Sequence, residues 1–118
     1  MRILDVDAVA PEEAPLLTDH LVPGEIVHVA FRSPTAVVLF TAARILLVER
    51  NALLDEKLET SSFSYRAMRQ FSFAEASGQG ARVAAKIWLG ADPQPLHLRA
   101  GPGTDLRALQ QFLAAKLA

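Results

Sequence analysis

The most constraining feature of the sequence is a pair of adjacent predicted strands that is apolar on both sides. Residues 35–41 read TAVVLFT and residues 44–50 read RILLVER, joined by a two-residue Ala-Ala link that predicts a tight hairpin. Successive side chains of a strand point to opposite faces. One face therefore carries Ala36, Val38, Phe40, Ile45 and Leu47, and the other carries Val37, Leu39, Leu46 and Val48. Both faces of this hairpin have to be removed from water.

The second face, formed by Val37, Leu39, Leu46 and Val48, needs a cover of its own. A sheet in a small β domain has one face on the core, and large exposed apolar patches are rare on monomers. The terminal helix of the chain can cover part of the second face, and a neighbouring subunit can cover the rest. We therefore expect the chain to form a homo-oligomer with these side chains at the interface.

Alternation of apolar and polar residues continues on both sides of the hairpin. Further strands are predicted over residues 25–32, 57–65, 69–76, 82–89 and 95–100. Pro23-Gly24, just before the first of them, has the composition of a type II turn. The sequence therefore predicts a mainly β fold, in which seven antiparallel strands between residues 25 and 100 bend into a small barrel or sandwich.

Helical patterns are confined to the two ends of this β region. Residues 11–21 open with a proline and two glutamates, which favours a short helix. Residues 104–117 place leucines one helical turn apart behind Thr104 or Asp105 as the N-cap, which predicts a C-terminal helix that caps the barrel. Residues 1–10 are expected to be flexible.

Length and composition limit the classes of function. The 118 residues suit a single domain, 1–118. Lys and Arg number 12 against 13 Asp and Glu, so a broad basic surface for nucleic acid is not expected. The absence of cysteine excludes disulfides and thiolate chemistry. The N-terminal residues lack the apolar core of a signal peptide, so we expect a cytoplasmic location.

No group of residues predicts a catalytic, cofactor or metal site. His20, His28 and His97 stand apart from one another and lack the spacing of a metal-binding pair. The glycine-containing stretch 77–80 precedes a predicted strand, whereas a phosphate-binding loop needs a following helix. We therefore expect no enzymatic activity, no cofactor and no metal.

A second hypothesis is a peripheral domain that binds anionic lipid or a small anion. A multiply charged head group needs several charge-assisted hydrogen bonds. The first predicted hairpin reads FRSPT and has Arg32 as its single cation. Arg32 is the anion contact in this hypothesis, and membrane binding is the less favoured function.

Several sequence segments, in order, resemble the short single-domain bacterial proteins of pleckstrin-homology-like (PH-like) fold. They are LVPGEIV (21–27), LFTAARILLVE (39–49), KLETSSFSYRAMRQFSFAEASG (57–78) and KIWLG (86–90). The resemblance spans about residues 16–117 with the terminal helix. It implies a seven-stranded barrel capped by a C-terminal helix and assembly into homo-oligomers, often ring-like, and it implies no ligand. We interpret the chain as a non-enzymatic binding or scaffold module that self-associates, with a protein or peptide partner still to be identified.

Overall fold

The computed structural model describes residues 3–51, 57–75, 82–101 and 104–117. The chain forms two compact units, which are described separately below. Unit 1 comprises Met1–Asp7 and Tyr65–Ala118, and unit 2 comprises Ala8–Ser64.

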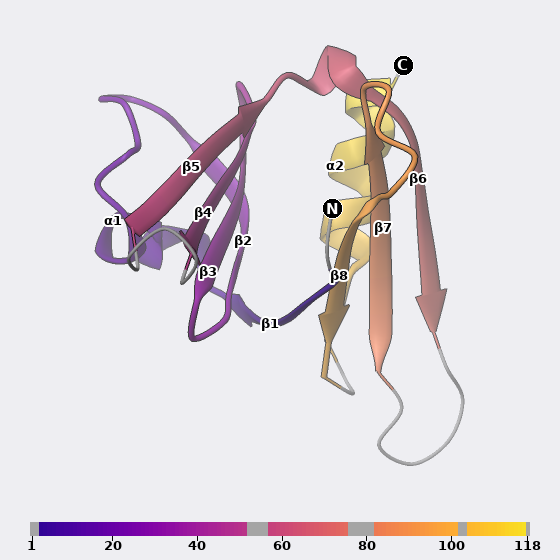
Figure 1. Ribbon diagram of the computed structural model, residues 1–118, viewed down its shortest axis with the longest axis horizontal. Helices are drawn as coiled ribbons and strands as arrows, with labels where there is room; N and C mark the ends of the chain where they lie inside the picture. Colours follow the sequence, from indigo (N-terminus) through magenta and orange to yellow (C-terminus); the bar gives the residue numbers. More distant parts are fainter. Residues whose placement is uncertain (1–2, 52–56, 76–81, 102–103, 118) are drawn as a thin grey trace. The chain divides into compact units, whose positions relative to one another are not determined.

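Eight strands account for most of the described regular structure (Figure 1). They are β1 (Ile3–Val9), β2 (Val27–Arg32), β3 (Ala36–Thr41), β4 (Ile45–Asn51), β5 (Lys57–Phe63), β6 (Met68–Glu75), β7 (Val83–Leu89) and β8 (Leu96–Ala100). The helical elements are the short 3-10 turns η1 (Pro11–Glu13) and η3 (Tyr65–Ala67) and the α-helices α1 (Ala14–Leu17) and α2 (Arg107–Leu117).

The mainly β fold with a C-terminal helix confirms the predicted class, but the N-terminal region differs from the prediction. Residues 3–9, expected to be flexible, form strand β1, so eight strands replace the expected seven. Leu4 and Val6 are buried on one side of β1 while Ile3 and Asp5 are exposed on the other, which is the alternation of a half-buried strand. The helix expected over 11–21 is reduced to η1 and the single turn α1, because Thr18 already has extended backbone angles.

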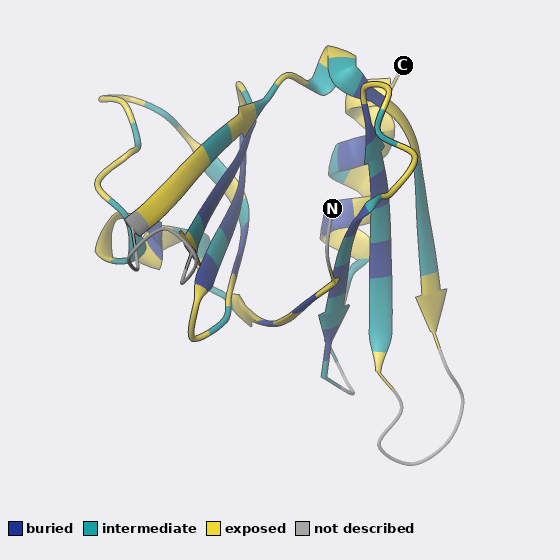
Figure 2. Ribbon diagram, in the orientation of Figure 1, coloured by how far each residue is buried: buried dark blue, intermediate teal, exposed yellow. Residues whose placement is uncertain are grey.

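Unit 2 contains an antiparallel sheet of strand order β5-β4-β3-β2. Val37 pairs with Val48, and Leu39 pairs with Leu46. The predicted tight turn between β3 and β4 is present, since the Thr41 backbone N–H donates to the Arg44 carbonyl oxygen at 2.9 Å. Figure 2 shows β3 and β4 as mostly buried, whereas the terminal strand β5 is largely exposed.

The segment that precedes β2 lies across this sheet (Figure 1). Ala14 of α1 is fully buried and packs in one apolar cluster with Leu39 and Leu46. Val9 and Leu21, at the two ends of the segment, are partly buried against the same cluster. Unit 2 therefore has an apolar core that is built from its own residues.

Unit 1 contains the strand order β1-β8-β7-β6, with α2 against its sheet (Figure 1). The β1–β8 pair is parallel, and the β8–β7 and β7–β6 pairs are antiparallel. Leu109 and Leu113 of α2 are buried, as its apolar stripe predicts. Asp105 lies one residue before the N-cap position, which is held by Leu106, whose carbonyl accepts from the Gln110 N–H. Asp105 still satisfies one N–H of the first turn, since its Oδ1 accepts a hydrogen bond from the Arg107 backbone N–H at 2.9 Å.

Candidate functional site

The strand register of unit 2 brings the sequence-predicted site residues onto one face of the sheet. Residues that pair directly across a ladder point to the same side. Arg32 of β2 pairs with Val37 of β3, which in turn pairs with Val48 of β4. Leu39 is two residues from Val37 on β3, and its partner Leu46 is two residues from Val48 on β4, so both point to the same side. The four apolar residues and the one cation therefore share a surface, which we call the second face.

One half of the second face is covered by the chain itself. Leu39 and Leu46 have no exposed surface, because the segment containing α1 packs over them. Val48 is 6% exposed, and Val37 is half-buried. This corrects the expectation that these side chains need a neighbouring subunit as their cover: the cover of Leu39 and Leu46 comes from the chain's own residues 9–21.

The other half of the second face opens into a groove. The groove has a volume of about 270 Å³ and lies entirely within unit 2. We call its apolar lining the floor, formed by Leu17, Pro34, Ala36, Val37, Val48 and Leu58, and its polar lining the walls, formed by Thr18, Asp19, His20, Ser33, Thr35 and Arg50. Two of the predicted interface residues, Val37 and Val48, thus line a concave surface.

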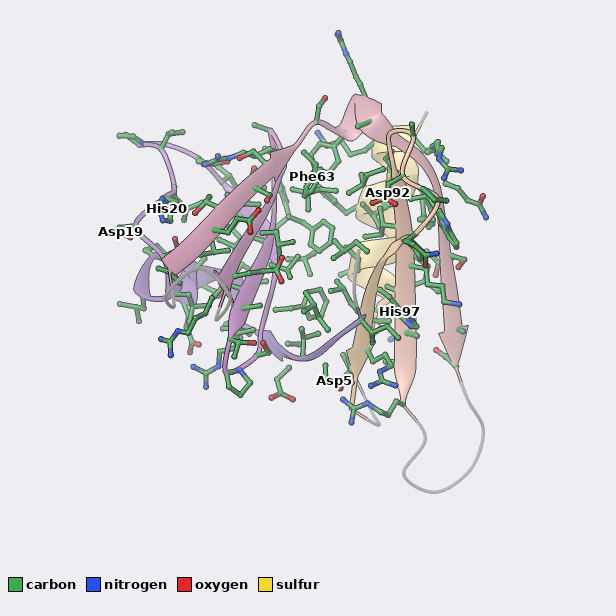
Figure 3. The ribbon with its side chains drawn as sticks, in the orientation of Figure 1. Asp5, Asp19, His20, Phe63, Asp92 and His97 are labelled. Carbon is green, nitrogen blue, oxygen red and sulfur yellow. The ribbon has the colours of Figure 1, made fainter. Side chains whose placement is uncertain are left out.

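Charged side chains lie in and beside this groove. Arg32 and Arg50 are exposed, and neither side chain has an ion-pair or hydrogen-bond partner among the described residues. Register places Arg32 beside Val37, and the Arg50 backbone N–H donates to the Thr35 carbonyl oxygen at 2.8 Å, so both cations belong to the end of the sheet near the β2–β3 turn. Asp19 lies on a different segment of the groove lining, the loop after α1 (Figure 3).

A hydrogen-bonded ion pair holds the loop after α1, which carries Asp19 and His20 of the groove lining. The Arg44 guanidinium donates to both carboxylate oxygens of Glu25, from Nε and Nη2, each at 2.9 Å. The Thr41 hydroxyl donates to Glu25 Oε2 at 2.8 Å, and Arg44 Nη1 donates to Ser62 Oγ at 2.8 Å. Arg44 Nη2 also donates to the His20 carbonyl oxygen at 2.9 Å, which ties the groove wall to the β3–β4 turn.

The environment of Glu25 favours its charged form. Its side chain is 3% exposed, and its pKa falls from 4.5 to about 2, chiefly because of the hydrogen bonds from Arg44. Burial acts in the opposite direction, and the Thr41 hydroxyl and the Val22 N–H add to the lowering. The pKa of Arg44 is raised by the same pair. Both groups are ionised at neutral pH, so the network is a structural clamp on the 20–25 loop.

Unit 1 carries charged residues that do not gather into a comparable site. The Arg99 guanidinium and the Asp5 carboxylate form a paired contact at 2.9 Å on the exposed side of the β1–β8 pair. Burial, followed by the charges of Lys86 and Arg99, lowers the pKa of His97, so this imidazole is neutral at pH 7. Across the described ranges, no group of three or more His, Cys, Asp or Glu side chains is placed to hold a metal ion.

The sequence of the chain matches a known protein family. It belongs to the bacterial PH domain family, whose sequence model matches residues 4–117. The match confirms the resemblance seen in the sequence and the PH-like fold, and it indicates no enzymatic family. Neither of the two described α-helices is long and apolar enough to cross a membrane.

Individual relatives support this placement. The uncharacterized protein YjqA of Bacillus subtilis (strain 168) is 28% identical over 96 residues, which is 80% of this chain and 77% of that protein. A crystal structure of a DUF1696 family protein with a pleckstrin-homology domain from Shewanella loihica PV-4 is similar with a TM-score of 0.76 at 23% identity, covering 97% of this chain and 98% of the other. A pleckstrin homology domain from Shewanella amazonensis SB2B has a TM-score of 0.65 at 23% identity, covering 90% and 92%. At this identity the structures establish the fold alone.

Sequence reasoning missed most of the groove's walls. Thr18, Asp19 and His20 come from a loop whose position depends on the Glu25–Arg44 pair. No local sequence pattern predicts the position of this loop. A signal for Arg50 was available: it ends the same predicted strand as Val48 and, two residues along, points to the same side. The sequence therefore allowed the prediction that both Arg32 and Arg50 border the second face.

Proposed function

We propose that this bacterial PH domain is a non-enzymatic binding module that holds a segment of a protein partner in the groove of unit 2. The observation that carries the proposal is the open half of the second face, where Val37, Val48 and Leu58 meet polar groove walls. A few apolar side chains in a concave surface with a polar rim are the usual elements of protein recognition.

The dimensions of the groove favour a side chain of a partner over a cofactor. Its volume of about 270 Å³ is below the roughly 300–1,000 Å³ of most small-molecule sites. Exposed apolar residues also concentrate on this unit: the described large hydrophobic residues that are more than half exposed include Leu16 at 86% and Leu58 at 61%. Leu58 lies on β5, the terminal strand of the sheet of unit 2, so no further strand of this unit lies beyond it.

Substitution of Leu58 tests the proposal. Leu58→Asp places a charge on the groove floor, and because the wild-type side chain is 61% exposed, the fold should tolerate it. Peptides selected from a random display library on the wild-type protein should lose at least about tenfold in affinity for Leu58→Asp, since an apolar anchor is worth about 1.5–3 kcal/mol. Titration by fluorescence anisotropy measures the change.

Ile3→Asp is the matched control, because Ile3 is also more than half exposed, at 52%, and lies in unit 1, outside the groove. It should leave peptide affinity unchanged. Equal losses in both variants, or selected peptides whose nuclear magnetic resonance shifts map away from Val37 and Val48, would contradict the proposed site.

Self-association is the second part of the proposed function, and it now rests on a different surface. The family resemblance leads us to expect a homo-oligomer, and the covered residues Leu39 and Leu46 no longer serve as its interface. Val22 and Ile26, which flank the Pro23-Gly24 turn, are 59% and 61% exposed and offer an apolar patch outside the groove. This patch is our candidate contact between copies, and it leaves the groove available for a different partner.

A further inference from the structure

The charges around the groove specify the kind of segment it receives. On the basis of the proposed function, we infer that the occupant is an extended acidic peptide, in which one apolar side chain fills the groove and a neighbouring carboxylate meets Arg32 and Arg50. These two guanidinium groups lack ion-pair partners among the described residues, as noted above. Planar guanidinium groups match carboxylates by paired hydrogen bonds.

The geometry places the apolar and cationic contacts side by side. Val37 is flanked by Arg32 across the β2–β3 ladder and by Val48 across the β3–β4 ladder. Arg50 and Leu58 are directly paired on β4 and β5, so a cation also borders the exposed apolar residue of the floor. Directly paired side chains in an antiparallel sheet have Cβ atoms about 4.5–5.5 Å apart. An apolar residue and an adjacent Asp or Glu of one peptide can therefore reach both kinds of contact.

Asp19 gives the groove a direction. It is the acidic side chain of the groove lining and lies on the loop after α1, whereas the two cations lie on β2 and β4. Its carboxylate repels an acidic residue on that side. The peptide should therefore place its carboxylate toward Arg32 and Arg50 and a neutral or basic residue toward Asp19. His20, on the same wall, is held through its backbone by Arg44 and leaves its imidazole exposed.

A matched set of labelled octapeptides tests this inference on the full chain. The first peptide has a central leucine flanked by aspartates, the second replaces the aspartates by asparagines, and the third replaces the leucine by alanine. Fluorescence anisotropy at low ionic strength should show the acidic leucine peptide binding tightest, with an affinity that weakens as salt is added. Arg32→Glu and Arg50→Glu should each weaken it by about fivefold or more.

Two further variants sharpen the test. Asp19→Asn should strengthen binding of the acidic peptide, because it removes the repelling carboxylate from the groove. Arg66→Glu makes the same change of net charge as Arg32→Glu and Arg50→Glu, but at an exposed residue of η3 in unit 1, and should leave the affinity unchanged. A gain from Asp19→Asn cannot be produced by loss of folding.

The outcomes separate the inference from the proposed function. If the asparagine peptide binds as tightly as the aspartate peptide, the groove binds apolar segments without charge selection and the inference is overturned alone. If the acidic leucine peptide binds no better than its alanine counterpart, both proposals fail. Sedimentation with vesicles of phosphatidylcholine and phosphatidylserine in a three-to-one ratio provides the last arm: Arg32-dependent binding to vesicles without peptide binding would assign the cations to a lipid surface instead.

Discussion

At the scale of single residues, Glu25 and Arg44 explain why two of the sequence segments that carry the family resemblance belong together. Glu25 lies in LVPGEIV, and Thr41 and Arg44 lie in LFTAARILLVE. In the fold these three side chains make one hydrogen-bonded network, and it fixes the loop after α1 that lines the groove. The sequence alone gives no means of assigning Glu25 as the partner of Thr41 and Arg44.

The lowered pKa of Glu25 predicts a dependence of stability on pH. The carboxylate titrates near 4.5 in the unfolded chain and near 2 in the fold, so the unfolded state binds more protons between these values. The contribution is complete above pH 4.5 and is lost as pH falls toward 2. The full shift corresponds to roughly 3 kcal/mol, and because Arg44 is partly exposed to solvent we expect about 1–2 kcal/mol.

Urea unfolding of the wild type and of Glu25→Gln at a series of pH values measures this contribution. Asp5 and Asp105 also have lowered pKa values, so the informative quantity is the difference in unfolding free energy between the two proteins. That difference should shrink as pH falls from 4.5 toward 2. A difference independent of pH in this window would show that Glu25 is not held as a carboxylate.

At the scale of elements, the turn before β2 shows where local sequence determines structure. The Glu25 backbone N–H donates to the Val22 carbonyl oxygen at 3.0 Å, and Gly24 has a φ of 81°. This is the type II turn expected from Pro23-Gly24. Any residue with a Cβ is strained at this φ, although no atom lies within 4 Å of the position a Cβ would occupy.

Gly24→Ala should therefore destabilise the protein by about 1 kcal/mol through backbone strain alone. Gly101→Ala is the control, since Gly101 has the same open surroundings without a positive φ. Thermal unfolding should show a lower midpoint for the first variant and an unchanged or slightly higher midpoint for the second. Equal effects at the two positions would mean that the turn relaxes to a different conformation.

The predicted strands are determined by the sequence nearby, whereas the strand that was missed depends on a distant partner. Strands β2 and β5–β8 were predicted from their alternation of apolar and polar residues, and β3 and β4 from their runs of β-branched and aliphatic residues. Strand β1 was missed, and residues 1–10 were expected to be flexible, although Leu4 and Val6 alternate with Asp5 and Asp7. Its burial depends on β8, which follows some ninety residues later, and only the tertiary pairing makes it visible.

At the scale of the whole molecule, the chain itself covers part of the two-sided hairpin. The chain covers Leu39 and Leu46 with its own N-terminal segment, so the apolar second face does not by itself require a second subunit. What sequence reasoning lacked was the path of residues 9–21, which depends on the Glu25–Arg44 pair and on burial of Ala14. The groove is the part of the second face that this path leaves open.

Self-association can be measured against this revised surface. Multi-angle light scattering of the wild type at micromolar concentration should give a mass above that of one chain. Ile26→Asp should lower this mass while the chain keeps its folded circular dichroism spectrum, since Ile26 is exposed. Leu39→Asp should instead destabilise the fold, because its side chain is fully buried. A wild-type mass equal to one chain would remove the oligomer from the proposed function.

The parallel β1–β8 pair has a consequence for the order in which the chain acquires its structure. Unit 2 is one continuous stretch of sequence, whereas unit 1 combines the start of the chain with its last half. During synthesis, β1 leaves the ribosome well before β8 and has no ladder to join until Ala100, the partner of Val6, has been made. Leu4 and Val6 therefore stay without their partner strand while all the strands between β1 and β8 are translated.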